Sequence, residues 1–387
     1  MKRLHSITII SGLILILQFQ VSAQFFRNPV VSPEIAEDQS VTFRIYAPKA
    51  EEVKLQGNWM PFMQQSLMTK NDTGLWSLKI EPLAPELYGY SFIVDGVNTL
   101  DPSNLLIKRD GTFRNESVLF IRGKGSELYE PKVGPKGTVH QVWYESPTLN
   151  LTRRMYVYTP PGYEKSKDSY PVLYLLHGGG GDEDAWTTLG LAPTIMDNLI
   201  NSGQAVPMLV VMTNGNPDQA ADISARPYRE SASMGGVGMA NQKFEESLVK
   251  DVIPYIESNF RVKKGRVNRA LTGLSMGGLQ TINSSFNYPE TYNYYGVMSM
   301  GFADLSRFGI QVDLSQRDTQ IKTLKASKPA LYWIACGKED FLYESVVTMR
   351  TELDKLDFPY IYRESDGGHT WTNWRIYLSE FAPKLFK

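Results

Sequence analysis

The segment Arg269-Ala270-Leu271-Thr272-Gly273-Leu274-Ser275-Met276-Gly277-Gly278 is a β-like run that leads into the pattern G-x-S-x-G. The residues that follow, 279–287, are compatible with a helix. A serine between a strand and a helix in this pattern is typical of a nucleophile elbow, whose glycines let the backbone pass where a Cβ would clash. We therefore expect Ser275 to be a nucleophile and the amide of Met276, at the helix N-terminus, to face a developing oxyanion.

The segments around this motif alternate between strand-like and helix-like patterns. Residues 171–176 and 208–212 are apolar runs of strand length, and residues 244–260 carry apolar side chains along one helical face. Strands that alternate with helices at this spacing predict a mostly parallel sheet covered by helices on both sides. We expect one α/β-hydrolase domain of this kind over residues 138–387.

A nucleophilic serine needs a base, and the chain has few histidines to supply one. His5 lies near the N-terminus, His140 precedes the first strands of the domain, and His177 opens a glycine-rich loop. In hydrolases with this elbow the chain order is serine, acid, histidine. Because His369 is the histidine that follows Ser275, we expect it to be the base.

The acid should lie between the serine and the histidine, just after a strand. Residues 330–336 form an apolar strand-like run, and Asp340 comes shortly after it. Glu339 is the neighbour most easily confused with it, and Asp366 is too close to His369 along the chain to orient the ring from a separate strand end. We expect Asp340 to hold the imidazole tautomer and to stabilise the imidazolium.

A second oxyanion donor is expected in the loop that follows the strand at residues 171–176. There His177 precedes four glycines, and glycines allow a backbone amide to face the substrate without side-chain obstruction. We favour the amide of Gly179, with Gly178 as its competitor, and expect His177 to orient the loop. The lysine and hydroxyl residue of a phosphate-binding loop do not follow these glycines.

An irregular stretch at residues 214–242 separates a strand from a helix and is a natural substrate-binding loop. Its Arg226, Tyr228 and Met234, with Trp371 beside the expected base, are candidates to contact a substrate. Each of these side chains can equally be a packing residue.

The front of the chain has a different pattern. Residues 24–123 contain short alternating runs separated by turn signals, which predict a small antiparallel β-sandwich. In this part we expect Trp76, in an alternating strand, to belong to the core. Residues 124–137 are rich in Gly, Pro and Lys and predict a linker.

Composition and the first residues bound the class of protein. The 387 residues carry a formal net charge of −1, so electrostatics favours neither nucleic acid nor an anionic membrane as a partner. The single cysteine, Cys336, lies in an apolar run and is expected to be a buried thiol. Residues 1–23 combine Lys2 and Arg3 with a short apolar run and a small-residue end, which predicts a cleaved signal peptide, a secreted or periplasmic protein and no membrane association after cleavage.

From about residue 139 onward the sequence resembles the esterase D-like α/β-hydrolases, especially carbohydrate esterase family 1, which includes feruloyl and acetylxylan esterases. The matching segments, in chain order, are Tyr156-Val157-Tyr158-Thr159-Pro160-Pro161-Gly162-Tyr163, Tyr174-Leu175-Leu176-His177-Gly178-Gly179-Gly180-Gly181, Gly273-Leu274-Ser275-Met276-Gly277-Gly278, Gly337-Lys338-Glu339-Asp340 and Gly368-His369-Thr370-Trp371. The resemblance implies a Ser275, Asp340 and His369 triad. The acyl-transfer cycle that it implies uses no metal or organic cofactor.

The front part resembles the immunoglobulin-like modules related to family 48 carbohydrate-binding modules. It does so at residues 41–48, 90–96 and 100–104. The resemblance implies an immunoglobulin-like sandwich that either binds glycan or serves as a packing partner of the esterase domain. If it binds glycan, Trp59, in the loop at residues 57–61, is the candidate contact. Together the two resemblances imply a secreted serine esterase that acts on acylated plant cell-wall polysaccharide or oligosaccharide, with a feruloyl esterase preferred. The alternatives are an acetylxylan esterase, a siderophore or small acyl-ester hydrolase and, in a different class, a non-catalytic glycan-binding protein. The sequence does not indicate an oligomeric state.

Overall fold

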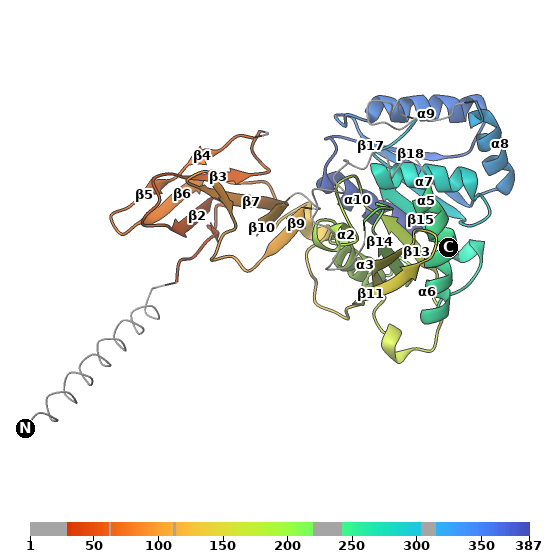
Figure 1. The fold of residues 1–387 in the computed structure, drawn as a ribbon, viewed down its shortest axis with the longest axis horizontal. Helices are drawn as coiled ribbons and strands as arrows, with labels where there is room; N and C mark the ends of the chain where they lie inside the picture. The colour runs from red at the N-terminus through yellow and green to blue at the C-terminus, as the bar shows by residue number, and fades with distance from the viewer. Residues whose placement is uncertain (1–28, 62, 111–113, 220–241, 303–314) are drawn as a thin grey trace, which may run out of the picture. The chain divides into compact units, whose positions relative to one another are not determined.

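The computed structural model describes residues 29–61, 63–110, 114–219, 242–302 and 315–387 (Figure 1). Its contacts divide these residues into two compact units. The first, the sandwich unit, contains the described residues up to Ala84, Tyr88–Ile107 and Ser117–Ile121. The second, the hydrolase unit, contains the described residues of Pro85–Leu87, Lys108–Glu116 and Arg122–Lys387. Two short segments within the predicted front domain, 24–123, therefore belong to the hydrolase unit.

The front part of the chain forms two small sheets, which contain the strands of the sandwich unit together with Leu87 and described residues of segment 108–116. One has the strand order β1-β2-β6-β5 and the other contains β4-β3-β7-β10-β9, with β8 paired to β7. The strands are β1 (Glu34–Ile35), β2 (Val41–Tyr46), β3 (Val53–Gly57), β4 (Ser66–Leu67), β5 (Thr69–Lys70), β6 (Leu75–Ile80), β7 (Leu87–Val94), β8 (Val97–Thr99), β9 (Ile107–Asp110) and β10 (Arg114–Phe120). Alternate residues of β2 and β3 are buried, and Trp76 lies in the core as expected. The predicted all-β fold of this part is confirmed.

The hydrolase unit is built on an eight-stranded sheet of order β11-β12-β14-β13-β15-β16-β17-β18. An antiparallel hairpin, β11–β12, forms one end, and the strands from β14 to β18 run parallel. The strands are β11 (Thr138–Ser146), β12 (Leu151–Thr159), β13 (Val172–Leu176), β14 (Leu209–Thr213), β15 (Arg269–Leu274), β16 (Tyr294–Met298), β17 (Leu331–Gly337) and β18 (Ile361–Ser365). Every residue of β13 is buried, as in a central strand covered on both faces.

Helices cover both faces of this sheet, which confirms the predicted α/β fold class (Figure 1). The main core packs against α5 (Lys243–Ser247), a π-helical turn (Leu248–Val252), α6 (Ile253–Asn259), α7 (Met276–Asn287), α8 (Arg317–Ser327) and α9 (Tyr343–Lys355). The opposite face is covered by α3 (Ala192–Asn201) and α10 (Trp371–Phe381), which contact each other. Alternation along β17 serves both faces: Cys336 lies in the main core, while Trp333 packs on Phe381 of α10. Cys336 is the buried thiol that the sequence predicts.

Parallel strands bring their carboxyl ends to one edge of the sheet, and this edge is where the chemistry gathers. His177 follows β13, Ser275 follows β15 and Ser299 follows β16. Asp340 and His369 come shortly after β17 and β18.

The predicted linker, residues 124–137, contributes to the hydrolase unit. Tyr129 is 2% exposed, and its hydroxyl donates to Glu86 Oε1 at 2.6 Å. Arg375 of α10 lies over the Tyr129 ring at 4.6 Å and forms an ion pair with Glu86 at 2.5 Å. These three side chains form a buried cluster that ties segment 85–87 to α10.

Among the described residues, no helix combines the length and apolar character that crossing a membrane requires.

Candidate active site

The strand β15 ends in a strained turn at Ser275. The backbone angles of Ser275 are φ 52° and ψ −115°, a conformation that residues other than glycine rarely adopt. α7 begins at the next residue, and Ser275 is partly exposed although its neighbours from Ala270 to Leu279 are buried. The turn therefore presents the hydroxyl at the sheet edge, as a nucleophile elbow does.

The two glycines of the motif are required by close backbone approach. A Cβ on Gly273 would lie 2.4 Å from the carbonyl carbon of Gly277. A Cβ on Gly277 would lie 2.6 Å from the carbonyl oxygen of His177. The elbow thus packs against itself and against the loop after β13, so a larger residue at either position would displace main chain.

An acid–base pair lies on the same edge. His369 Nδ1 is 2.9 Å from Asp340 Oδ1 and 3.0 Å from Oδ2, which joins the turn after β18 to the turn after β17. The Asp340 residue is 4% exposed and the His369 side chain 18% exposed. The structure therefore brings together the predicted acid and base, and Ser275 shares their edge of the sheet.

Hydrogen bonds keep the Asp340 carboxylate charged. Burial alone would raise its pKa, but the hydrogen bond and charge of His369 and hydrogen bonds from the Leu342 amide and Ser299 hydroxyl outweigh this effect. The pKa of Asp340 is therefore lower than usual, and the carboxylate can stabilise an imidazolium beside it. The Leu342 amide donates to Oδ1 at 2.9 Å.

Sequence reasoning missed several residues that brace this pair. Ser299 is fully buried with φ 51°, and its hydroxyl accepts a hydrogen bond from Trp374 Nε1 at 2.9 Å. The Trp374 ring stands edge-on to the His369 ring at 4.9 Å. Asn373 Nδ2 donates to the carbonyls of Asp366 and Gly368, which holds the turn that carries the histidine. A serine after a strand and an asparagine in a helix carry no local signal of such roles.

Aromatic rings surround the histidine. Phe341, which sequence reasoning also missed, lies 4.4 Å from the His369 ring and is 65% exposed. Trp371 stands edge-on to Trp186 at 5.2 Å and to Trp374 at 5.1 Å. The structure thus places the predicted contact Trp371 in an aromatic cluster at the start of α10, with part of its surface exposed.

The imidazole of His177 is held in one neutral tautomer. Nδ1 lies 2.7 Å from the Gly178 carbonyl oxygen, which can only accept, so Nδ1 carries the proton. Nε2 accepts from the Gly215 amide at 2.7 Å. Burial lowers the pKa of His177 although Asp182 and Glu183 act in the opposite direction. His177 therefore connects two loops of the sheet edge and cannot serve as a base in this state.

The glycine loop passes directly beside the elbow. A Cβ on Gly178 would lie 2.5 Å from Leu274 Cδ1 and 3.3 Å from Ser275 Cβ, whereas a Cβ on Gly179 would meet nothing within 4 Å. The Gly181 amide donates to the Gly178 carbonyl, which closes a turn, and in the described structure the Gly179 amide has no backbone partner. The amide of Met276 belongs to the first turn of α7, where helical partners are missing. Both predicted oxyanion donors therefore come from segments that flank Ser275.

The start of the predicted substrate loop is firmly held. Gly215 donates to His177, and its carbonyl accepts from Gln280 Nε2 of α7 at 2.7 Å. The buried guanidinium of Arg153 donates to three main-chain carbonyls of the same segment, those of Asn214, Asn216 and Gln219.

Three of the predicted contacts, Arg226, Tyr228 and Met234, lie outside the described residues. Trp59 belongs to the sandwich unit, where it stacks on Phe43 at 5.7 Å and stands edge-on to Tyr88. Much of its ring is therefore engaged in packing.

Among the residues described, no group of three or more His, Cys, Asp or Glu side chains is arranged to hold a metal ion.

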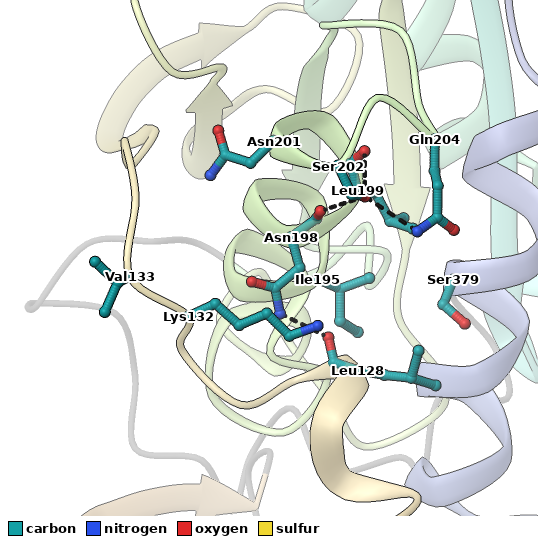
Figure 2. Close-up of a pocket in the computed structure, with 10 residues that line it drawn as sticks. All are labelled: Leu128, Lys132, Val133, Ile195, Asn198, Leu199, Asn201, Ser202, Gln204 and Ser379. Atoms are coloured by element: carbon teal, nitrogen blue, oxygen red, sulfur yellow. Dashed lines mark hydrogen bonds between the residues drawn. The ribbon is translucent and has the colours of Figure 1, made fainter.

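A surface pocket of about 260 Å³ lies elsewhere on the hydrolase unit (Figure 2). Asn198 of α3 reaches from its wall to the Leu128 carbonyl. None of the predicted site residues lines it; the lining residues are Leu128, Lys132, Val133, Ile195, Asn198, Leu199, Asn201, Ser202, Gln204 and Ser379.

Comparison with known proteins identifies related sequences for both units. A family described as putative esterase matches residues 146–385, and carbohydrate-binding module 48, described as an isoamylase N-terminal domain, matches residues 30–107. An endo-1,4-beta-xylanase/feruloyl esterase of Xylanibacter ruminicola is 30% identical over 363 residues, which cover 92% of this chain. This chain spans about half, 46%, of that relative's length. An acetyl esterase of Caldicellulosiruptor saccharolyticus is 23% identical over 249 residues, 56% of this chain and 84% of that protein.

Solved structures share the fold. A ferulic acid esterase of Anaeromyces mucronatus, solved in complex with ferulic acid, matches with a TM-score of 0.56 and 22% identity over 67% of this chain and 95% of its own. An enterobactin esterase of Shigella flexneri matches with a TM-score of 0.65 and 16% identity over 90% of this chain and 93% of its own. At these identities the likeness concerns the fold alone.

Proposed function

This chain belongs to the putative esterase family, and we propose that it hydrolyses feruloyl esters of plant polysaccharide or oligosaccharide through an acyl-enzyme on Ser275. The observation that carries the proposal is the hydrogen bond between His369 Nδ1 and the buried Asp340, on the sheet edge that also exposes Ser275. Acyl transfer needs a carboxylate-supported imidazole and a nucleophilic serine, and both lie on this edge.

In the proposed first step, His369 Nε2 takes the proton of Ser275 Oγ while Oγ attacks the ester carbonyl carbon. The carbonyl oxygen becomes an oxyanion and accepts hydrogen bonds from the amides of Met276 and Gly179. Asp340 stabilises the imidazolium that forms. His369 then gives its proton to the leaving alcohol oxygen as the carbon–oxygen bond breaks, which leaves the acyl group on Ser275.

In the second step, water replaces the alcohol. His369 accepts a proton from the water as its oxygen attacks the acyl carbon, and the same two amides hold the second oxyanion. Proton return to Ser275 Oγ releases the carboxylic acid. All groups in this cycle belong to the chain itself.

The choice of a feruloyl ester rests on the relatives. One curated relative is named as a xylanase and feruloyl esterase, and a structural neighbour was solved with ferulic acid. The match of the front unit to a carbohydrate-binding module fits a polysaccharide substrate. An acetyl ester is the second candidate, because another curated relative is named an acetyl esterase.

The experiment compares wild-type protein with Ser275→Ala on methyl ferulate, acetylated xylan, 4-nitrophenyl acetate and a catecholate siderophore ester. We expect ferulate release by the wild type and a loss of at least about 10,000-fold in the variant. Ser284→Ala is the matched control, because Ser284 is a buried serine on the same helix, α7, and lies beyond the elbow. Its activity should stay close to wild type.

Other outcomes would reassign the function. Release of acetate from xylan without ferulate release would make the protein an acetylxylan esterase, and turnover of the catecholate ester alone would make it a siderophore hydrolase. Binding to xylan without turnover of any ester would make it a glycan-binding protein. Activity that survives Ser275→Ala unchanged would refute the mechanism.

Export and the front unit's role are part of the same proposal. Residues 1–23 lie outside the described residues, and we propose that they are removed so that the exported protein begins at Gln24. N-terminal sequencing of protein from culture medium or periplasm tests this.

Glycan contact by Trp59 is tested by xylan binding of the full chain carrying Trp59→Phe, which keeps a ring for packing on Phe43.

A further inference from the structure

Phe341 is an exposed aromatic side chain beside the catalytic histidine. It is 65% exposed, whereas large apolar side chains generally lose most of their surface on folding. The other strongly exposed aromatic residue in the described hydrolase unit, Trp143, has the guanidinium of Arg154 near its ring. Phe341 instead has the His369 ring, at 4.4 Å and a 47° tilt, as its aromatic neighbour.

The position of Phe341 is fixed by the acid of the triad. The Asp340 amide donates to the Gly337 carbonyl, and the Leu342 amide donates to Asp340 Oδ1. The Tyr343 amide then donates to the Asp340 carbonyl at 2.9 Å. Phe341 is thus at the tip of a turn that the Asp340 carboxylate itself closes, so its ring is held near the histidine by the same bonds that hold the acid.

Sheet order decides which half of an ester this ring faces. β13, which carries the oxyanion loop, is the neighbour of β15 on one side, and β16, β17 and β18 follow on the other. His369 and Phe341 therefore lie on the side of Ser275 opposite Gly179. In acyl transfer the histidine protonates the leaving alcohol, so the leaving alcohol must come within hydrogen-bond reach of His369. Its substituents then come next to the Phe341 ring.

We propose that Phe341 is a specificity-determining residue that recognises the sugar ring carrying the leaving hydroxyl. The C–H bonds on one face of a sugar ring make that face apolar, and an exposed aromatic ring can cover it without competing for the sugar's hydroxyl groups. The same ring offers little to a methanol leaving group. This inference rests on the proposed function, because it requires that the leaving group depart beside His369.

The test uses two esters with the same acyl group: methyl ferulate and a feruloyl ester of arabinose. For Phe341→Ala we expect kcat/KM to fall about tenfold on the sugar ester, mainly through KM, and to change less than about twofold on methyl ferulate. Phe341→Trp keeps an aromatic face and should retain the preference for the sugar ester. Val267→Ala is the matched control, because Val267 is another exposed apolar side chain of the hydrolase unit, at 62% exposure, away from the sheet edge.

An equal loss on both esters would overturn the proposal, since Phe341 would then act by supporting the histidine. No loss on either ester would also overturn it. The exposed position predicts a Tm close to wild type, and Phe341→Leu provides a second variant that keeps apolar bulk. Failure of the proposed function looks different, because wild-type protein would then release ferulate from neither ester.

Discussion

The turn with His369 and the loop with His177 follow two strands of the same sheet edge, yet they put an imidazole to opposite uses. His369 has a carboxylate on one ring nitrogen, and its side chain is 18% exposed. His177 is 1% exposed, gives Nδ1–H to a carbonyl and accepts a backbone amide on Nε2. A charged partner stabilises the imidazolium, whereas a partner that donates a hydrogen bond needs the neutral ring.

Position at a strand end therefore does not by itself make a histidine catalytic. Its hydrogen-bond partners decide whether it can accept a proton. Both ring nitrogens of His177 form hydrogen bonds that join the glycine loop to the segment after β14. Burial lowers the pKa of the ring. In the proposed cycle, Nε2 of His369 receives the proton of Ser275.

The largest effect should come from the turn after β18. Replacement of His369 by Ala removes the base and the acid of the cycle, so kcat should fall about 10,000-fold or more while KM changes little. Steady-state hydrolysis of methyl ferulate measures this. A loss below about 100-fold would mean that another group accepts the serine proton, and His177 would have to be reconsidered.

A smaller effect should come from the loop after β13. His177→Ala leaves the Gly178 carbonyl and the Gly215 amide without their partner, which loosens one oxyanion donor and should lower kcat about 10- to 100-fold. His177→Gln can offer a donor and an acceptor in similar places and should recover part of this loss. If His177→Ala were as damaging as His369→Ala, and His177→Gln recovered nothing, the contrast between the two histidines would collapse.

The smallest effect concerns stability rather than rate. Burial makes the folded-state pKa of His177 lower than the unfolded-state value of about 6.5. The stability that the neutral ring contributes is therefore fully present above the unfolded-state value. It is lost as the pH falls from there toward the folded-state pKa. Between pH 7 and pH 5.5 the free energy of unfolding of wild-type protein should therefore fall more than that of His177→Gln. Urea titrations at the two pH values measure the difference. Parallel pH dependence of the two proteins would show that the native ring does accept a proton.

The α/β class, the sandwich and the pairing of Asp340 with His369 were within reach of sequence reasoning. β13 and β17 are uniformly apolar, the elbow motif is local, and chain order leaves one histidine after Ser275. The residues that support this pair could not be predicted, because Ser299 and Trp374 meet it only when β16, β17 and α10 come together. The clamp of Arg153 on the segment after β14 is likewise a contact between distant parts of the chain.

The buried ion pair between Arg375 and Glu86 limits where a gene fragment that encodes the hydrolase unit can begin. A gene fragment that starts at residue 124 encodes Ser275, Asp340 and His369 but omits Glu86. Its product would keep a guanidinium that is 2% exposed without its counter-ion, and breaking such a pair costs about 3–5 kcal/mol. The hydrolase unit therefore includes the short stretch around residue 86, and a fragment meant to fold as this unit should contain it.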